Sequence, residues 1–321
     1  MKNSKKISLI LILVLALIFI SVSLVYLKEK KKALEIKKQN FLVTEFSAKG
    51  GKEEILPVAI MIDNYPGLKE EGTCEAKIIY EAPAEGEIMR FLAIFDLEDL
   101  PEKIGPIRSV RSYFIELAED YQGFLVHAGG SPETKTILKK KNNLVYNLDE
   151  ISADGIYFWR DKESEPPFNL FTNKSLIKKA IQDKNLKIKE NKNFLYEKDE
   201  FLKNGVNLIE IKSRQPIIWK FSQEKKSYFR FKEKSKEPFE TQNLVILKTE
   251  MKVIDEIGRL KIRLKGEGEA FIFKNGGIIK GVWTRDEQTP LKFYNLEKQE
   301  IKFLPGKIWI KIVNHGVKIS F

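Results

Sequence analysis

The chain has almost no cysteine or histidine, and this scarcity excludes several kinds of site. Cys74 is the single cysteine, so no disulfide can form within one chain. The two histidines, His127 and His315, are far apart in the sequence and make no metal-binding pattern with it. The sequence also lacks a phosphate loop, a dinucleotide-binding fingerprint and a nucleophile elbow. We therefore expect no metal and no cofactor.

Charge is absent from residues 7–27, ISLILILVLALIFISVSLVYL. As a helix this run would be about 31 Å long, which matches the hydrocarbon thickness of a bilayer. It is longer than a signal-peptide core, and its small residues Ser21 and Ser23 are followed by more apolar chain. We predict an uncleaved transmembrane anchor behind a short tail, residues 1–6. Lysines flank both ends of the run, so the positive-inside rule does not fix its orientation.

Basic residues outnumber acidic ones, 56 to 45, which gives a formal net charge of +11. Lysine supplies most of the excess, with 47 lysines against 9 arginines. A lysine-rich surface is often only a solvated face, and the alternative is attraction to anionic polymers or lipid headgroups. No nucleic-acid-binding motif accompanies the charge, so a nucleic-acid partner is not expected.

Residues 55–204 have the pattern of an α/β domain. Behind a charged stalk or linker at residues 28–54, apolar runs predict strands at 55–63, 77–84, 87–96 and 123–129. Helical spacing predicts helices at 107–121 and 131–141, and a lysine-rich extension holds two more, at 174–182 and 197–205. This alternation indicates a mixed or parallel sheet.

Residues 205–321 have a different pattern, in which short strands are separated by turn residues. Asn275-Gly276 lies between two of these strands and is a strong hairpin signal, because both positions tolerate a positive φ. The pattern predicts a small all-β domain, either a sandwich or a barrel.

One strand-to-helix turn has features of an anion site. FLVHAGGSPETKTIL, residues 124–138, ends a strand at His127, passes Gly129 and Gly130, and starts a helix for which Ser131 is a good N-cap. Amide groups at such a helix start favour an anion. A plain tight turn would use the same glycines, and the sequence leaves both interpretations open.

Three of the nine arginines, Arg90, Arg108 and Arg111, fall within 22 residues. In a lysine-dominated chain this indicates a need for planar, bidentate contacts to an anion. Arg108 and Arg111 are expected on one face of a helix start, and Arg90 interrupts an apolar strand. The alternative is that the nearby acidic residues of YEAPAEGE, Glu81, Glu85 and Glu87, neutralise the arginines inside the fold.

Further polar residues are candidates for the same cleft. Asp63 and Asn64 follow the first predicted strand, or form a turn before Pro66, and Arg160 and Asn169 lie in a proline-containing loop. Ligand sites of open α/β sheets form where such strand ends meet. The predicted site therefore comprises Asp63, Asn64, Glu85, Arg90, Arg108, Arg111, His127, Gly129, Gly130, Ser131, Arg160 and Asn169.

Several blocks together resemble the YerB-like family of bacterial lipoproteins, which have two adjacent domains of unknown function. The blocks similar to its N-terminal domain are PVAIMIDN, YEAPAEGEIMRFLAIF, KIGPIRSVRSYFIELA and VHAGGSPE, and those similar to its C-terminal domain are GEGEAFIFKNGGIIKGVW and LPGKIWIKIV. The resemblance covers residues 55–321. It implies an extracytoplasmic body at the bacterial cell membrane.

The sequence departs from the family pattern in two places. No cysteine that could receive a lipid follows the apolar run, so a spanning helix is expected to replace the lipid anchor. The family pattern near residue 168 reads Pro-His-Asn, whereas this chain has Pro167-Phe168-Asn169. If that histidine is an acid or base in relatives, Phe168 cannot take its place.

Three functions are compatible with these features. The first is a single-pass membrane protein whose cleft binds an anionic envelope component, either a glycopolymer or a peptidoglycan fragment. The second is an envelope hydrolase or transferase, with Glu85 or His127 as general base and glycine amides as an oxyanion site. The third is a scaffold that contacts other envelope proteins through the β domain.

Overall fold

The computed structural model describes most of the chain behind the predicted anchor and stalk. The described residues are 57–86, 88–140, 145–153, 155–186, 205–213, 216–231 and 238–321. No helix within these ranges is long and apolar enough to cross a membrane. The predicted anchor at 7–27, the stalk at 28–54 and nearly all of the predicted helix at 197–205 lie outside them.

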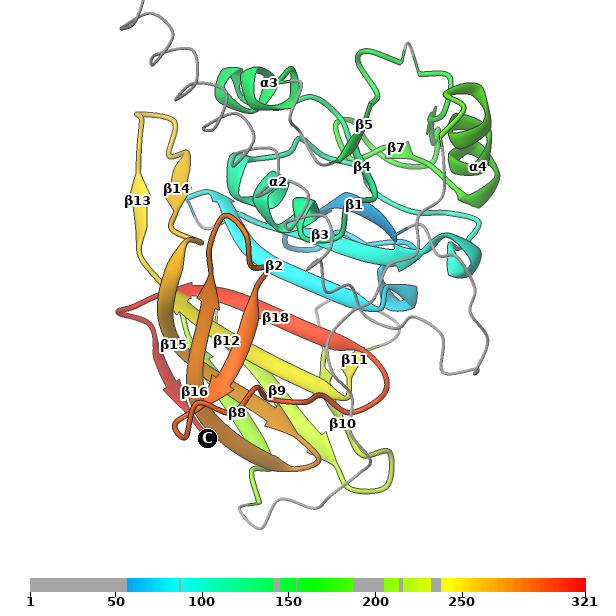
Figure 1. The fold of residues 1–321 in the computed structure, drawn as a ribbon. Helices are drawn as coiled ribbons and strands as arrows, with labels where there is room; N and C mark the ends of the chain where they lie inside the picture. Colours follow the sequence, from blue (N-terminus) through cyan, green and yellow to red (C-terminus); the bar gives the residue numbers. More distant parts are fainter. Residues whose placement is uncertain are drawn as a thin grey trace, which may run out of the picture. The chain divides into compact units, whose positions relative to one another are not determined.

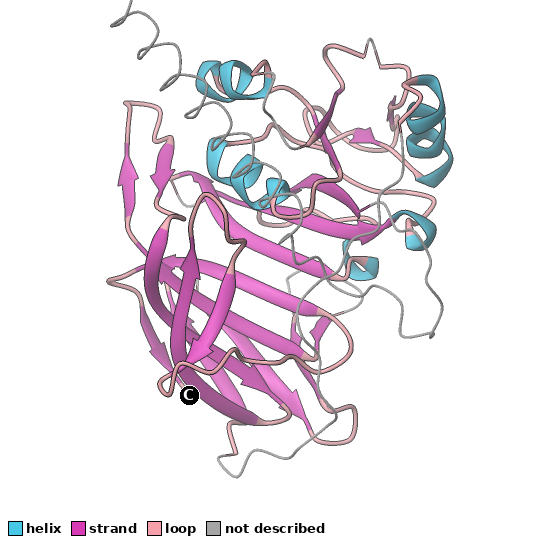
Figure 2. Cartoon of the chain, viewed as in Figure 1, coloured by secondary structure: helices cyan, strands magenta, loops and turns pink. Residues whose placement is uncertain are grey.

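Strands make up most of the regular structure (Figure 2). One mixed sheet contains ten of them, in the order β17-β16-β15-β12-β18-β2-β3-β1-β4-β5. Their bounds are β1 (Pro57–Asn64), β2 (Ile78–Glu85), β3 (Ile88–Asp96), β4 (Phe124–His127), β5 (Tyr146–Asp149), β12 (Asn243–Thr249), β15 (Gly266–Lys274), β16 (Gly277–Arg285), β17 (Lys292–Asn295) and β18 (Ile308–Asn314). The expected mixed sheet is therefore confirmed.

A second sheet of five strands packs on part of the first (Figure 1). Trp219 of the smaller sheet stacks edge-on against Trp309 of β18, with ring centroids 5.1 Å apart. Tyr228 meets Phe273 of β15 in the same layer. The predicted all-β character after residue 205 is confirmed. The strands of this sheet, in the order β11-β10-β9-β8-β19, are β8 (Leu208–Lys212), β9 (Ile217–Ser222), β10 (Ser227–Arg230), β11 (Phe239–Thr241) and β19 (Lys318–Ser320).

Short elements complete the described structure. Two small ladders pair β6 (Trp159–Arg160) with β7 (Leu170–Phe171), and β13 (Met251–Val253) with β14 (Leu260–Ile262). The helices are α2 (Ser112–Glu119), α3 (Pro132–Leu138) and α4 (Lys174–Asp183), with 3-10 turns η1 (Thr73–Glu75) and η2 (Leu97–Asp99). Helix α4 confirms the helix expected at 174–182.

Asn275 and Gly276 form the predicted hairpin turn between β15 and β16. Their φ angles are 47° and 75°, and Lys274 pairs with Gly277 across the turn. A two-residue turn with both φ angles positive matches the twist of the strands that it joins.

The helix predicted at 107–121 begins later than expected, at Ser112. Residues 107–111 are extended instead: Ile107 bridges Ile62 of β1, and the amide of Arg108 donates to the carbonyl of Met61. The Val110 amide likewise donates to the Gly129 carbonyl. Hydrogen bonds to distant strands therefore override the local helical pattern. Arg108 and Arg111 do not share a helix face, because only Arg111, as N-cap, touches the helix.

Strands from both sides of residue 205 join the large sheet. β18 runs parallel to β2, with Ile308 opposite Ile78, and it also pairs in parallel with β12. The α/β and all-β segments of the chain thus share one hydrogen-bonded sheet.

Candidate functional site

Several predicted site residues meet at one edge of the large sheet. Strands β1, β2, β4 and β5 run in the same direction, whereas β3 runs against β1 and β2. Their carboxyl ends therefore lie together, and these ends contain Asp63, Glu85 and His127. Open sheets bind ligands at such an edge. The side chains form two separate groups there.

The first group, which we call the arginine cluster, consists of Asp63, Glu85, Arg90, Arg108 and Arg111. Asp63 and Arg90 are directly opposite each other on β1 and β3. The Nε atom of Arg108 lies 2.7 Å from Oδ2 of Asp63. The two strands and the extended segment 107–111 thus bring both arginines to one carboxylate.

Glu85 forms ion pairs with two guanidinium groups of the cluster, those of Arg90 and Arg111. Its Oε2 is 2.9 Å from Nη2 of Arg90, and its Oε1 pairs with Nη2 of Arg111. The register of β2 shifts between Pro83 and Glu85, at a proline that cannot donate to the ladder. The internal neutralisation that the sequence left open is therefore present at Glu85.

Arg90 is almost completely buried, with 4% of its surface exposed. Its Nη1 donates to the carbonyl of Ser109 at 2.8 Å. Burial lowers the pKa of Arg90 to about 10, and the nearby charge of Arg108 acts in the same direction, whereas Asp63 opposes the shift. Arg90 still carries its charge at neutral pH. The cluster therefore combines three positive and two negative side chains, an excess of one positive charge.

Arg108 is the most open guanidinium of the cluster, with a quarter of its side chain exposed. It lies over the ring of Phe168, 5.5 Å from the centroid, and Phe168 in turn packs 5.4 Å from Tyr65. Within the described residues, Nη1 reaches only the Pro167 carbonyl, at 3.4 Å, and Nη2 has no protein partner. A partly exposed guanidinium over an aromatic ring is a surface that a ligand can reach.

The second group is the glycine loop of residues 127–131, where hydrogen bonds within the protein engage the Gly129 amide and the Ser131 side chain. The amide of Gly129 donates to Oδ1 of Asp149 at 2.7 Å. Gly129 has a φ of 66°, which explains the glycine at this turn. The sequence left a tight turn and an anion site open for this loop. The Gly129 amide fits the tight turn, because the carboxylate of Asp149 on the neighbouring strand accepts its hydrogen bond. Ser131 is the predicted N-cap and accepts from the Thr134 amide.

His127 is buried, and both of its ring nitrogens face protein groups. Nδ1 lies 2.8 Å from the Gly129 carbonyl oxygen, and Nε2 lies 2.6 Å from Oδ1 of Asn147. Three strand spacings, about 14 Å in all, separate β2 from β4, and the strand registers place Val126 level with Ile79, six residues before Glu85. Glu85 and His127 are therefore apart both across the sheet and along it. They do not form an acid–base pair.

The remaining predicted residues lie outside the arginine cluster. Asn64 points to the face opposite Asp63 and donates to Oε1 of Glu81 at 3.3 Å. Arg160 donates to Asn169 at 3.2 Å and to Glu150 at 3.1 Å. These contacts connect β5, β6 and the loop before β7, and they do not reach the cluster.

Comparison with known proteins matches both halves of the chain to one family. Residues 44–187 match the "Protein of unknown function (DUF3048) N-terminal domain", and residues 208–310 match the corresponding C-terminal domain. The chain belongs to the DUF3048 family. It is 31% identical over 275 residues to a Bacillus subtilis (strain 168) protein named "Putative lipoprotein YerB", and the match covers 80% of this chain and 81% of that protein.

A solved DUF3048 structure has the same fold. The crystal structure of YerB from Bacillus subtilis superposes with a TM-score of 0.75 at 29% identity, covering 87% of this chain and 98% of that one. The resemblance deduced from the sequence blocks is therefore confirmed.

The two DUF3048 domains meet at a buried charge group that the sequence did not predict as a unit. Glu81 of β2 accepts hydrogen bonds from Arg230 of β10 at 2.8 Å and from Trp309 of β18 at 2.9 Å. Lys311 of β18 lies 3.0 Å from its other oxygen. Burial alone would raise the pKa of Glu81, but the charges of Arg230 and Lys311 lower it to about 2.

A sequence signal for this group existed in two strands, since Glu81 interrupts the apolar run 78–84 as Lys311 does its own. Lys311 interrupts the apolar run 308–313, as Arg90 interrupts β3, and a charge inside such a run requires a buried partner. Asp149 gave a weaker signal, as an acidic residue at the end of the strand beside His127.

Proposed function

We propose that this protein is a membrane-anchored, extracytoplasmic envelope protein that binds an anionic glycopolymer or peptidoglycan fragment at the surface formed by Tyr65, Arg108 and Phe168. Its envelope location is supported by family membership and by the name of the Bacillus relative, which describes a lipoprotein. The uncharged run at residues 7–27 supports attachment through a single span.

The observation that carries the binding proposal is the environment of Arg108. Its side chain is a quarter exposed and belongs to a cluster with one excess positive charge, and its guanidinium lies over the ring of Phe168, which packs against Tyr65. Guanidinium groups bind phosphate and carboxylate oxygens in pairs, and aromatic faces pack against sugar rings. A polymer with alternating anionic groups and rings matches both features.

The contacts of Glu85 and His127 support binding rather than catalysis. Both oxygens of Glu85 are held by guanidinium groups, and both nitrogens of His127 face protein groups. Protein contacts therefore hold both side chains. The Arg108 surface therefore needs no chemical step to explain its composition.

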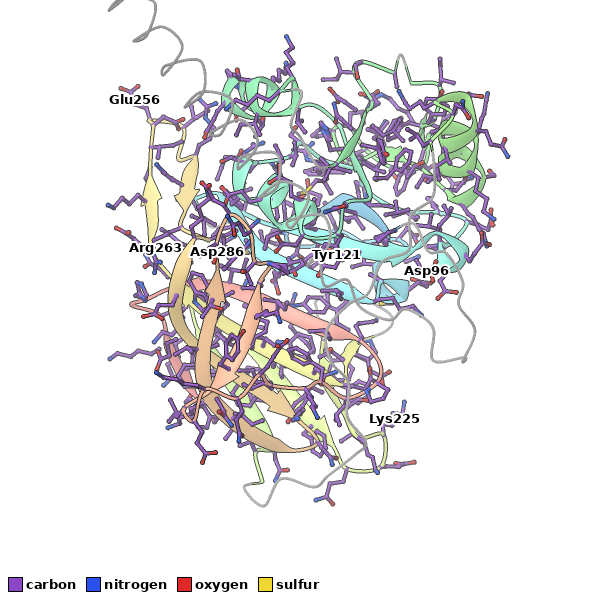
Figure 3. The ribbon with its side chains drawn as sticks, in the orientation of Figure 1. Asp96, Tyr121, Lys225, Glu256, Arg263 and Asp286 are labelled. Atoms are coloured by element: carbon purple, nitrogen blue, oxygen red, sulfur yellow. The ribbon has the colours of Figure 1, made fainter. Side chains whose placement is uncertain are left out.

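Binding is tested with the full-length protein in phosphatidylcholine nanodiscs and two probes, poly(glycerol phosphate) and purified peptidoglycan. Arg108→Ala should weaken binding of at least one probe by about tenfold, because the exposed guanidinium supplies its charge-assisted contacts. The matched control is Lys225→Ala, which removes one charge from the turn between β9 and β10 (Figure 3). Equal binding by the wild type and Arg108→Ala would refute the proposal.

Cys74 provides a separate test of location. It is the single cysteine of the chain, and it is exposed. A membrane-impermeant maleimide should label it on intact cells, and the Cys74→Ser variant should show no label. Labelling that requires cell lysis would place the body on the cytoplasmic side and contradict the proposal.

A further inference from the structure

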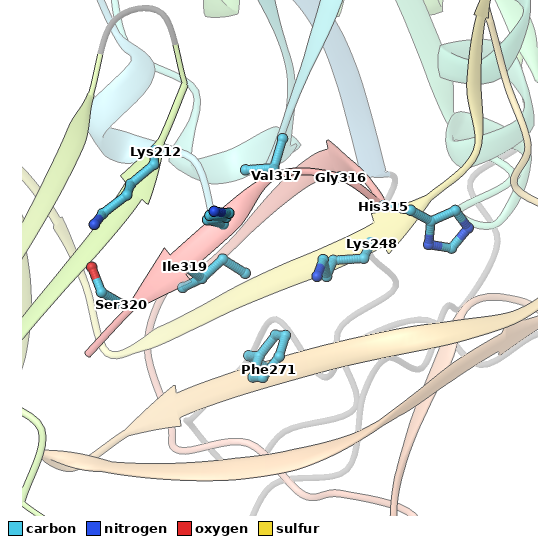
Figure 4. A pocket seen from close by; sticks show the side chains of 9 residues that line it. Lys212, Lys248, Phe271, His315, Gly316, Val317, Ile319 and Ser320 are labelled. Atoms are coloured by element: carbon cyan, nitrogen blue, oxygen red, sulfur yellow. The ribbon is translucent and has the colours of Figure 1, made fainter.

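A groove at one end of the two packed sheets lies away from the arginine cluster. It has a volume of about 480 Å³ and is formed by β12 and β15 of the large sheet and by β8, β19 and the β18–β19 turn (Figure 4). The residues that define its chemistry are Lys212, Lys248, Phe271, His315, Lys318 and Ile319.

Lys248 occupies a position that the strand pattern assigns to the core. Side chains alternate along β12, and Leu244 and Ile246 on the same face are fully buried against the smaller sheet. Lys248 continues this row where the two sheets separate, and its side chain is 17% exposed. Its ammonium lies 5.9 Å from the centroid of the Phe271 ring. The apolar row of the core thus ends in a cation above an aromatic face.

The basic side chains of the groove come from separate elements and exceed the acidic ones. Lys248 lies 3.1 Å from Glu269, and Lys212 lies 3.9 Å from Glu210. Lys318 has no carboxylate within ion-pair distance among the described residues. Half of the Glu269 side chain is exposed, and an ion pair in contact with solvent contributes little to stability. An incoming anion can therefore exchange with these carboxylates at small cost.

The apolar lining of the groove adjoins Lys248. It consists of Phe271, on the strand next to that of Lys248, and Ile319 of β19. The ring of Phe321 packs 6.0 Å from Phe271 and 5.6 Å from Phe273. A small inorganic anion would use the lysines and leave these rings in contact with water. A ligand that carries both an anionic group and an apolar body would cover both the lysines and the apolar side chains.

We propose that this groove binds an anionic amphiphile, with its phosphate or carboxylate held by Lys248 and Lys318 and its apolar part against Phe271 and Ile319. The site is independent of the Arg108 surface, since the two share no residue. A membrane lipid and a soluble amphiphile offer the same chemistry. The comparison ligands therefore have to distinguish the contribution of the anionic head group from that of the apolar body.

The test uses full-length protein in phosphatidylcholine nanodiscs and calorimetric titration with dihexanoyl-phosphatidic acid, which is soluble in water. Two comparison ligands separate the contributions: inorganic phosphate has the head alone, and dihexanoyl-phosphatidylcholine has the same body with a zwitterionic head. Wild-type protein should bind the phosphatidic acid about tenfold more tightly than either.

Variants then assign the binding to the groove. Lys248→Met with Lys318→Met should weaken phosphatidic acid binding by about tenfold, because both ammonium groups are lost while the side-chain length is kept. Lys184→Met with Lys225→Met removes the same charge from exposed positions outside the groove and should change binding by less than about twofold. Lys318→Met alone, on the edge strand β19, repeats the test without altering β12.

Three results would overturn the proposal. Equal weakening by both pairs of variants would show a general charge effect. Equal affinity for inorganic phosphate would show that the apolar lining takes no part, and equal affinity for phosphatidylcholine would show that the lysines take none. Loss of binding in Lys248→Met/Lys318→Met with Arg108→Ala unaffected distinguishes this site from the surface proposed above.

Discussion

Glu81 is a single carboxylate on which residues distant in the sequence converge. It is fully buried and is held by Arg230, Trp309 and Lys311 through contacts of 2.8–3.0 Å. A buried ion pair does not by itself stabilise a fold, but removal of one partner leaves the others buried without compensation. Glu81 therefore has a large effect on stability although it lies in no proposed binding site.

Glu81→Gln should lower the free energy of unfolding at pH 7 by about 3–5 kcal/mol, because two buried cations lose their counter-charge. The folded pKa of Glu81, about 2, lies below its ordinary value of 4.5. Its ionisation therefore contributes stability that is present above pH 4.5 and is lost as the pH falls toward 2. Urea unfolding at several pH values measures both effects.

In the variant, stability should fall less steeply between pH 4.5 and 2 than in the wild type. Glu224→Gln, at an exposed position, serves as the control and should leave the curve unchanged. A wild-type slope in the Glu81→Gln protein would show that another carboxylate causes the acid sensitivity.

At the scale of elements, local pattern predicted the strands well and the entry to α2 poorly. The apolar runs at β1 and β3 and the Asn275-Gly276 turn depend on neighbouring residues alone, so the sequence was sufficient to predict them. Residues 107–111 have helical spacing, yet their hydrogen bonds go to Met61 and Gly129. Such partners are determined by the folded sheet, so a short stretch of the sequence does not indicate them.

In the candidate site, too, contacts between residues close in the sequence were predictable and contacts between separate strands were not. Glu85 lies five residues from Arg90, and the sequence suggested that internal acidic residues could neutralise the arginines. The carboxylate that occupies the Gly129 amide comes from another strand, Asp149 on β5, and the sequence analysis did not consider it. Contacts between separate strands require the strand order, which the sequence does not state.

The hairpin turn provides an element-scale test. Gly276→Ala should lower the free energy of unfolding by about 1–3 kcal/mol, since φ is 75° and a Cβ would lie 2.7 Å from the Phe221 ring. Gly316→Ala, where a Cβ would meet nothing within 4 Å, should change stability by less than about 0.5 kcal/mol. Thermal unfolding of both variants measures this, and equal effects would contradict the turn geometry.

At the scale of the whole described structure, the two DUF3048 domains are connected by more than the sheet. Arg285 at the end of β16 is buried and contacts Asp120 behind α2 at 3.0 Å, and its Nη2 also donates to the Glu116 carbonyl. With the β2–β18 pair and Glu81, this gives three buried connections between segments that are far apart in sequence. We expect the two segments to unfold together.

Arg285→Met should destabilise both segments at once, by about 3–5 kcal/mol, because Asp120 loses its buried partner. Hydrogen exchange measures this region by region: protection of β1 and α2 should fall by the same factor as protection of β12 and β15. Faster exchange in the C-terminal strands alone would show that the segments unfold separately.

The place of β18 has a consequence for biosynthesis. This strand follows β2 in the sequence by more than 220 residues, yet it fills the gap between β12 and β2. A nascent chain emerging amino-terminus first must hold β2 with one unpaired, aggregation-prone side until residues 308–314 arrive. The large sheet is therefore completed only after residues 308–314 have been made. For a chain exported as proposed, a chaperone that shields this side of β2 until then would raise the yield of folded protein.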